Sequence, residues 1–252
     1  MQPGSAPEVE FDIAVRRASL RYGGAFLFRD LDFVLPAARW TSLLGPSGVG
    51  KSSLLRVIAG LAPLHGGEVV CSDGRPLAGR LAWMSQRDDL LPWLSVLDNV
   101  TLGARLRGES TDREKAMDLL GLVGLVPQKD QLPATLSGGQ RQRAALARTL
   151  MEDRPVVLMD EPFSALDAIT RARLQVLAAD LLAGRTVLLV THDPLEALRL
   201  SHRIQVMTGH PARIEDSPPP PGALPRDLHD PALLGRQGDL LAQLADARDD
   251  AA

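Results

Sequence analysis

The sequence predicts an α/β fold in which short buried strands alternate with helices. Two short apolar runs, residues 41–44 and 156–159, have the length and composition of buried parallel strands. The first run is followed by a glycine-rich loop and then by KSSLLRVIAGL, in which Leu54, Leu55 and Ile58 share one helical face. Patterns typical of strands and helices alternate again towards residue 206. These observations favour a sheet of buried strands with helices packed against it.

The loop after the first strand, GPSGVGKSS, fits the phosphate-binding pattern GxxxxGK[ST]. Its glycines let the backbone curl so that N–H groups point at phosphate oxygens, and the helix N-terminus adds partial positive charge there. We expect Lys51 to reach the β- and γ-phosphates of ATP and the Ser52 hydroxyl to bind Mg²⁺. A glycine-rich turn that merely precedes a helix is the simpler alternative, but the strand–loop–helix context favours nucleotide binding. The candidate ATP-binding residues of this loop are Gly45, Pro46, Ser47, Gly48, Val49, Gly50, Lys51, Ser52 and Ser53.

The second strand ends in a pair of carboxylates, Asp160 and Glu161. Open α/β sheets bind ligands at the carboxyl ends of their strands, so this pair is expected beside the phosphate loop. Asp160 would hold Mg²⁺ directly or through water, and Glu161 would orient and polarise the attacking water. Taken alone, an acidic pair would more simply cap the next element. The phosphate loop earlier in the chain favours the catalytic interpretation.

Three further motifs complete an ordered set: a lone Gln86, LSGGQ at 136–140, and His192 after the apolar run TVLLV. With them, the chain resembles the nucleotide-binding subunit of an ABC transporter from about residue 11 to about residue 213. LSGGQ distinguishes that family from other P-loop ATPases. The resemblance implies an ATPase that uses ATP and Mg²⁺. It also implies a P-loop NTPase (RecA-like) core, an N-terminal antiparallel β subdomain and an inserted α-helical subdomain that carries LSGGQ.

The LSGGQ motif has the chemistry of an anion site at the start of a helix. Ser137 can cap the helix, while Gly138 and Gly139 leave its first N–H groups bare. The resemblance implies that this site binds the γ-phosphate held by the phosphate loop of a partner subunit. Two nucleotide sites would then form at the interface of a head-to-tail homodimer. The signature residues are Ser137, Gly138, Gly139 and Gln140.

The resemblance assigns roles to four more residues, one position at a time. Tyr22 would stack on adenine, although a tyrosine at this point could also be a core residue. Gln86 would sense Mg²⁺ and the attacking water, whereas an isolated glutamine is usually a polar surface residue. Asp167, in the loop SALD, would link the two sites across the dimer, and His192 would contact the γ-phosphate. The implied catalytic residues are Glu161, His192 and Gln86, and the implied Mg²⁺ ligands are Ser52, Gln86 and Asp160.

The expected organisation is an ATP-binding domain at 9–213, with the helical subdomain at about 88–150, and a Pro-rich linker with a short helical tail at 214–252. The proline run SPPPPG marks the start of this tail, because it is too rich in proline for helix or sheet. Asp230 would cap the tail helix, with Pro231 at its first position.

Two local features are expected inside the domain. Asp73-Gly74 is typical of a hairpin turn. In TDREKAMDLLGLVGL, Thr111 is expected to cap an amphipathic helix, with Glu114 three residues further on.

Composition limits the partners. The chain has 252 residues, a net charge of −3 and a pI of about 6.0, with no basic run, which argues against nucleic acid as a partner. Its one cysteine, Cys71, cannot form an internal disulfide and is expected to be inert. The first ten residues lack the features of a signal peptide, and no apolar run approaches the ~20 residues that span a bilayer. We therefore expect a peripheral protein on the cytoplasmic face of the inner membrane, with separate transmembrane permease subunits.

The segment after Gln86 bears on what the ATPase drives. Leu90, Leu91, Trp93 and Leu94 are apolar, and the family resemblance places there the groove that receives a helix of the permease. The alternative is that they pack inside the helical insert, as some of them must. Trp93 is the candidate exposed anchor. The segment resembles importers of nitrate, sulfonates, taurine and thiamine-precursor pyrimidines, which use a periplasmic binding protein. The alternative is a soluble ABC-type ATPase that acts as an assembly factor and takes no part in transport.

Overall fold

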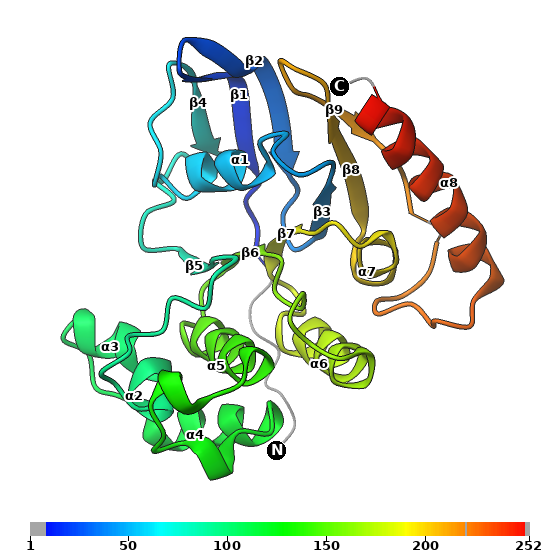
Figure 1. Ribbon diagram of the computed structural model, residues 1–252. Coiled ribbons are helices and arrows are strands. Elements are labelled where there is room, and N and C mark those ends of the chain that lie inside the picture. Colours follow the sequence, from blue (N-terminus) through cyan, green and yellow to red (C-terminus); the bar gives the residue numbers. More distant parts are fainter. Residues whose placement is uncertain (1–8, 220, 250–252) are drawn as a thin grey trace.

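A six-stranded, mostly parallel sheet forms the centre of the computed structural model, which describes residues 9–219 and 221–249 (Figure 1). The expectations about a signal peptide, the linker and the tail fall partly on residues 1–8, Pro220 and 250–252, which lie outside the described residues. The strand order is β5-β6-β7-β3-β8-β9, and every neighbouring pair is parallel except β8 with β9. The strands are β3 (Trp40–Leu44), β5 (Leu81–Met84), β6 (Val156–Asp160), β7 (Thr186–Val190), β8 (Arg203–Thr208) and β9 (Arg213–Asp216).

The central strands are apolar because helices or strands cover both of their faces. Every residue of β3, β6 and β7 is buried, which confirms the strands expected from the two apolar runs. Alternate residues of β6 point to opposite faces of the sheet and pack against different helices. Val157 and Met159 pack with α5 (Gly138–Met151) and α6 (Ala168–Leu181), whereas Val156 and Leu158 pack with α1 (Lys51–Ile58). The sheet therefore separates α1 from α5.

The N-terminal part forms a three-stranded antiparallel sheet, as expected, in the order β2-β1-β4. Its strands are β1 (Ile13–Tyr22), β2 (Ala25–Leu35) and β4 (Gly66–Cys71). The prediction of a hairpin at Asp73-Gly74 is wrong. The turn forms, with the Gly74 N–H donating to the Cys71 carbonyl at 3.0 Å, but β4 pairs with β1 and the next strand, β5, pairs with β6. The turn redirects the chain from one sheet to the other.

Helices α2 (Val96–Val100), α3 (Leu102–Leu106), α4 (Arg113–Leu122) and α5 gather at the end of the molecule away from the antiparallel sheet (Figure 1). The prediction that Thr111 caps α4 is wrong by one residue. Asp112 is the cap, because its carboxylate accepts a hydrogen bond from the Lys115 N–H at 2.9 Å. Leu90 packs inside this subdomain at 7% exposure, so it is not part of an exposed groove.

The C-terminal helix α8 (Pro231–Asp249) packs beside β8 and α7 (Pro194–Leu200) at the far side of the sheet (Figure 1). Asp230 caps it as expected, since its carboxylate accepts from the Ala232 N–H at 2.9 Å. Leu233 and Leu240 are fully buried against the end of β3 and against β8. The tail is thus part of the packed fold. Among the described helices, none has the length and apolar character needed to cross a bilayer.

Candidate nucleotide site

The sheet order brings the separate motifs to one edge. The phosphate loop follows β3, Asp160 ends β6, and His192 lies two residues after β7. Gln86 lies two residues after β5 and is exposed. Because β5, β6, β7 and β3 are adjacent and parallel, their carboxyl ends meet at the same edge. Segments more than a hundred residues apart in the sequence therefore meet at the carboxyl ends of these strands.

The phosphate loop has a backbone that requires glycine. Gly45, Gly48 and Gly50 have φ values of 150°, 84° and 117°. At Gly45 a Cβ atom would also collide with the carbonyl oxygen of Met207 in β8, so the loop lies pressed against the sheet. Helix α1 begins directly after Gly50, which points its free N–H groups into the loop. This cradle fits the phosphates of a nucleotide.

The Lys51 side chain folds back onto the start of the phosphate loop. Its ammonium donates to the carbonyl oxygens of Gly45 at 2.7 Å and Pro46 at 2.8 Å. Burial lowers the pKa of Lys51, and the carboxylates of Glu161 and Asp160 act in the opposite direction. A single ammonium is therefore held between the loop and the acidic pair, where phosphate oxygens would share it.

Asp160 and Ser52 supply oxygen atoms side by side. Asp160 is only 4% exposed, and burial raises its pKa, while a hydrogen bond with Ser52 lowers it and the nearby Glu161 raises it. A buried carboxylate with a hydroxyl neighbour fits a divalent cation, because Mg²⁺ prefers oxygen ligands and would offset the cost of burying the charge. These residues and the nucleotide phosphates would form the Mg²⁺ site.

Glu161 follows β6 directly, and its side chain contacts His192, which follows the neighbouring strand β7. Its φ is 51°, in the left-handed region that costs about 1 kcal/mol for a non-glycine residue. Its N–H donates to the carbonyl of Val190 at 2.8 Å, which fixes this turn. The carboxylate then lies 3.1 Å from Nδ1 of His192. The two residues expected to act on the γ-phosphate and the water are thus in direct contact.

Gln142, which the sequence interpretation did not single out, holds the loop after Glu161. Its amide nitrogen donates to the Glu161 carbonyl at 2.9 Å and to the Ser164 hydroxyl at 3.2 Å, and its amide oxygen accepts from the Ala165 N–H at 2.7 Å. This side chain is 6% exposed and sits on the face of α5 that also buries Ala145 and Thr149. The sequence signal that could have identified Gln142 is its spacing, which places this polar side chain on a buried face of the helix. It links helix α5, which starts at the signature motif, to the loop that follows Glu161.

The signature motif forms a capped helix end, as expected. The Ser137 hydroxyl accepts from the Gln140 N–H at 3.2 Å, and the Gln140 side chain accepts from the Ser137 N–H at 2.7 Å. A Cβ at Gly139 would lie 3.2 Å from the Ala165 carbonyl oxygen, so the helix start rests against the SALD loop. Since α5 and α1 lie on opposite sides of the sheet, this helix end and the phosphate loop belong to different layers.

The two remaining candidates lie at element ends. Tyr22 ends β1 and is 55% exposed, which excludes the core alternative. Asp167 caps α6, because its carboxylate accepts from the Thr170 N–H at 3.0 Å, and this bond lowers its pKa. Both side chains are exposed.

Glu196, which the sequence interpretation did not identify, is a buried carboxylate close to Glu161 and His192. It lines a cavity of about 40 Å³ with Glu161, Phe163, Ser164, Arg171, Thr191, His192 and Asp193. Burial raises its pKa to about 7, against hydrogen bonds from Thr191 and Gln175 that lower it. The Gln175 amide donates to it at 3.1 Å.

This carboxylate makes stability depend on pH in a defined direction. The pKa of Glu196 is about 7 in the folded chain against 4.5 for the ordinary group, so the folded state binds a proton more tightly. Unfolding free energy should therefore fall as pH rises through this window, by about 3 kcal/mol in all. Glu196→Gln removes this effect, so the variant should gain stability over the native chain between pH 5 and 8.

Urea unfolding at several pH values measures this gain. Glu215→Gln is the matched control, because Glu215 is exposed on β9. Parallel pH profiles for Glu196→Gln and the native chain would contradict the assignment.

A glycine-rich phosphate loop, a buried Asp160 beside Ser52, and a Glu161–His192 pair at one sheet edge define a P-loop ATPase. Residues 28–164 match the ABC transporter family, and the chain belongs to this family of ATP-binding subunits. Its nucleotide is accordingly ATP, with Mg²⁺ as the usual ion.

Similar proteins cover most of the chain. It is 45% identical to an uncharacterised ABC transporter ATP-binding protein of Haemophilus influenzae, over 92% of this chain and 98% of that one. It is 48% identical to the aliphatic sulfonates import ATP-binding protein SsuB 1 of Rhodococcus jostii, over 90% and 91%. The fold matches the dimeric ATP-binding cassette MJ0796, bound to ADP and Pi, with a TM-score of 0.74, 27% identity, and coverage of 83% of this chain and 100% of that one.

Proposed function

We propose that this chain is the ATP-hydrolysing subunit of a bacterial importer of a small solute of the sulfonate or taurine class. The observation that carries the ATPase role is the convergence of Lys51, Asp160, Glu161 and His192 at one edge of the sheet. The importer role is supported by the sulfonate relative and by a taurine import ATP-binding protein of Pseudomonas aeruginosa, 46% identical over 75% of this chain and 74% of that one. Those relatives speak against the soluble assembly-factor alternative.

Each residue at the edge would have a defined task. The loop N–H groups and Lys51 would hold the β- and γ-phosphates, and Tyr22 would stack on the adenine. Ser52, Asp160 and Gln86 would hold Mg²⁺, which supplies positive charge against the phosphate oxygens. Glu161 would orient the attacking water and take up its proton.

His192 would position that carboxylate from the adjacent strand, as their 3.1 Å contact allows, and reach the γ-phosphate. Asp167 would connect this edge to the second site.

Two copies would work together, head to tail. The signature helix and the phosphate loop of one chain lie in different layers, which favours contact of Ser137 and its glycines with the γ-phosphate held by the other copy. In this proposal residues 9–213 form the ATPase domain, with the helical subdomain at about 88–150 and the tail at 214–252. The fold neighbour MJ0796 is dimeric.

Trp93 is the proposed contact with a separate permease subunit at the cytoplasmic face of the membrane. It is 70% exposed, and Leu91 and Leu94 beside it are half-buried. Its loop is rigid because the buried Asn99 amide donates to the carbonyls of Leu91 and Leu94 at 3.1 Å each and accepts from the Leu91 N–H at 2.7 Å. An exposed aromatic residue on a fixed loop suits an interface pocket. A periplasmic binding protein would deliver the solute.

Co-purification from membranes tests this proposal. The tagged native chain should bring down a polytopic membrane protein, and Trp93→Asp should reduce its recovery by about tenfold or more while ATP hydrolysis stays unchanged. Leu106→Asp is the matched control, since Leu106 is 78% exposed on the same subdomain. Recovery of soluble partners alone would contradict the importer role.

A further inference from the structure

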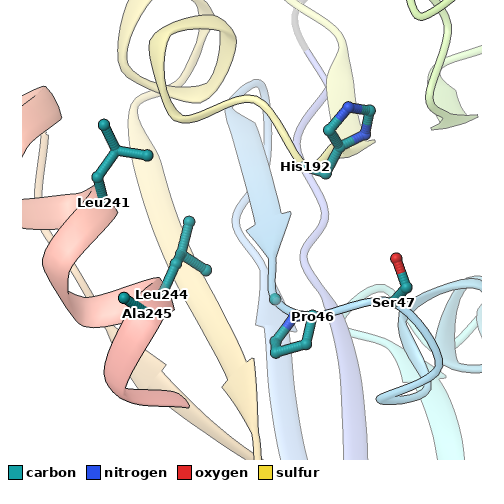
Figure 2. Close-up of a pocket in the computed structure, with 7 residues that line it drawn as sticks. Pro46, Ser47, His192, Leu241, Leu244 and Ala245 are labelled. Carbon is teal, nitrogen blue, oxygen red and sulfur yellow. The ribbon is translucent and has the colours of Figure 1, made fainter. Parts of the chain in front are cut away.

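An apolar cavity of about 410 Å³ opens beside the phosphate loop, and the C-terminal helix forms one of its walls (Figure 2). The loop supplies the opposite wall, and His192 lies at its end. We call it the α8 cavity; its lining residues are Gly45, Pro46, Ser47, His192, Leu241, Leu244 and Ala245. Most of these side chains are apolar, so the cavity continues the nucleotide site with a surface that suits an apolar group and offers little to phosphate.

Helix α8 presents more apolar surface than its packing requires. Leu233 and Leu240, seven residues apart, are buried against the sheet. Leu234 and Leu241, one position further on, form a second stripe at 52% and 50% exposure. The buried stripe fixes the helix, so Leu241 is held in place beside the cavity. Of these two exposed leucines, Leu241 lines the α8 cavity and Leu234 does not.

An exposed apolar side chain lies next to the signature motif as well. Ile169 is 84% exposed and is the second residue of α6, directly after the SALD loop. That loop rests against the start of α5: a Cβ added at Gly139 would lie 3.2 Å from the Ala165 carbonyl oxygen, and the Ala165 N–H donates to the Gln142 amide oxygen at 2.7 Å. Each chain thus carries an apolar cavity beside its phosphate loop and an apolar side chain beside its signature helix.

The α8 cavity and the segment that ends at Ile169 are connected through the contact between Glu161 and His192. His192 lines the α8 cavity, and Glu161 begins the loop that leads to Ile169. If the signature helix of one copy faces the phosphate loop of the other, the segment beside the first faces the cavity beside the second. We propose that the α8 cavity is part of the interface between two copies of this chain and receives Ile169 of the second copy. This inference rests on the head-to-tail arrangement proposed above.

Cysteine cross-linking tests the contact directly. The chain carries Ile169→Cys and Leu241→Cys together with Glu161→Gln, and the native Cys71 is buried at 8% exposure. Mild oxidation with ATP present should give a covalent dimer, whereas either cysteine alone should not. Leu106→Cys with Leu241→Cys is the matched control pair, because Leu106 is exposed on the far subdomain. Light scattering follows dimer formation in the same samples.

The outcomes separate this inference from the proposed function. Dimers that form with ATP but do not cross-link through positions 169 and 241 would overturn the cavity contact alone. Failure of the Glu161→Gln chain to form any ATP-dependent dimer would overturn the head-to-tail arrangement, and the cavity contact with it. A cross-linked dimer of the test pair, absent from the control pair, would support both.

Introducing a charged side chain into the α8 cavity tests the contact independently of the cross-linking. Leu241→Asp should weaken ATP-dependent dimerisation by about tenfold, because the aspartate would have to be desolvated against Ile169. Binding of a fluorescent ATP analogue to the monomer should not change. Leu234→Asp alters the same exposed stripe outside the cavity lining and should leave dimerisation as it is. Equal weakening by both substitutions, or by neither, would overturn the assignment of the cavity.

Discussion

Glu161→Gln should lower the rate of ATP hydrolysis by at least about 10²-fold while leaving ATP binding intact, because general-base assistance typically contributes that much or more. In the proposed function this carboxylate accepts the proton of the attacking water, and an amide cannot accept it. The substitution keeps the shape of the side chain, and the left-handed turn is held by the backbone bond to Val190. His192 can still contact the amide. The variant should therefore bind ATP and accumulate as a dimer.

Single-turnover hydrolysis and equilibrium binding of a fluorescent ATP analogue measure the two effects separately. Glu215→Gln, an exposed carboxylate on β9, is the control and should hydrolyse ATP at the native rate. Near-native turnover by Glu161→Gln would remove Glu161 from its role. Loss of both turnover and ATP binding would show that the residue supports the loop structure instead.

The parts of the site that were predicted from sequence are those with local causes. Gly45, Gly48 and Gly50 have positive φ angles that favour glycine, and a Cβ at Gly45 would also collide with the Met207 carbonyl, so these requirements appear within one short stretch of sequence. The strands at Trp40–Leu44 and Val156–Asp160 are buried on both faces and are therefore mostly apolar, without the alternation of a half-exposed strand. The helix caps at Ser137 and Asp230 depend on side chains within a few residues.

Apart from the cap of α4, which is shifted by one residue from Thr111 to Asp112, the features that sequence interpretation missed depend on contacts between distant segments. The turn at Asp73-Gly74 is real, but the choice of partner strand is made by β1 and β6, far away in the chain. Leu90 looks like its apolar neighbours in sequence, and only the packing of the helical subdomain decides that it is buried while Trp93 is exposed. The Gln142 contacts and the α8 cavity likewise join residues 19 or more positions apart.

Lys51→Ala should weaken ATP binding by about 10- to 100-fold and lower turnover as well, since charge-assisted hydrogen bonds in a buried site contribute about 1.5–3 kcal/mol each. Lys51 is the buried ammonium of the loop, held by the carbonyls of Gly45 and Pro46. Without it those carbonyl oxygens and the carboxylates of Asp160 and Glu161 would face the phosphates with no compensating charge, so both the bound state and the transition state lose stabilisation.

Fluorescence titration with an ATP analogue and steady-state ATPase assays measure the two losses. Lys129→Ala is the matched control, because that lysine pairs with Asp130 at the surface of the helical subdomain and should change neither quantity. Retained folding, shown by an unchanged circular dichroism spectrum, separates a binding defect from collapse of the loop. Unchanged nucleotide affinity would count against the phosphate-loop assignment itself, because no other lysine lies in this loop and the carboxylate pair would repel the phosphates.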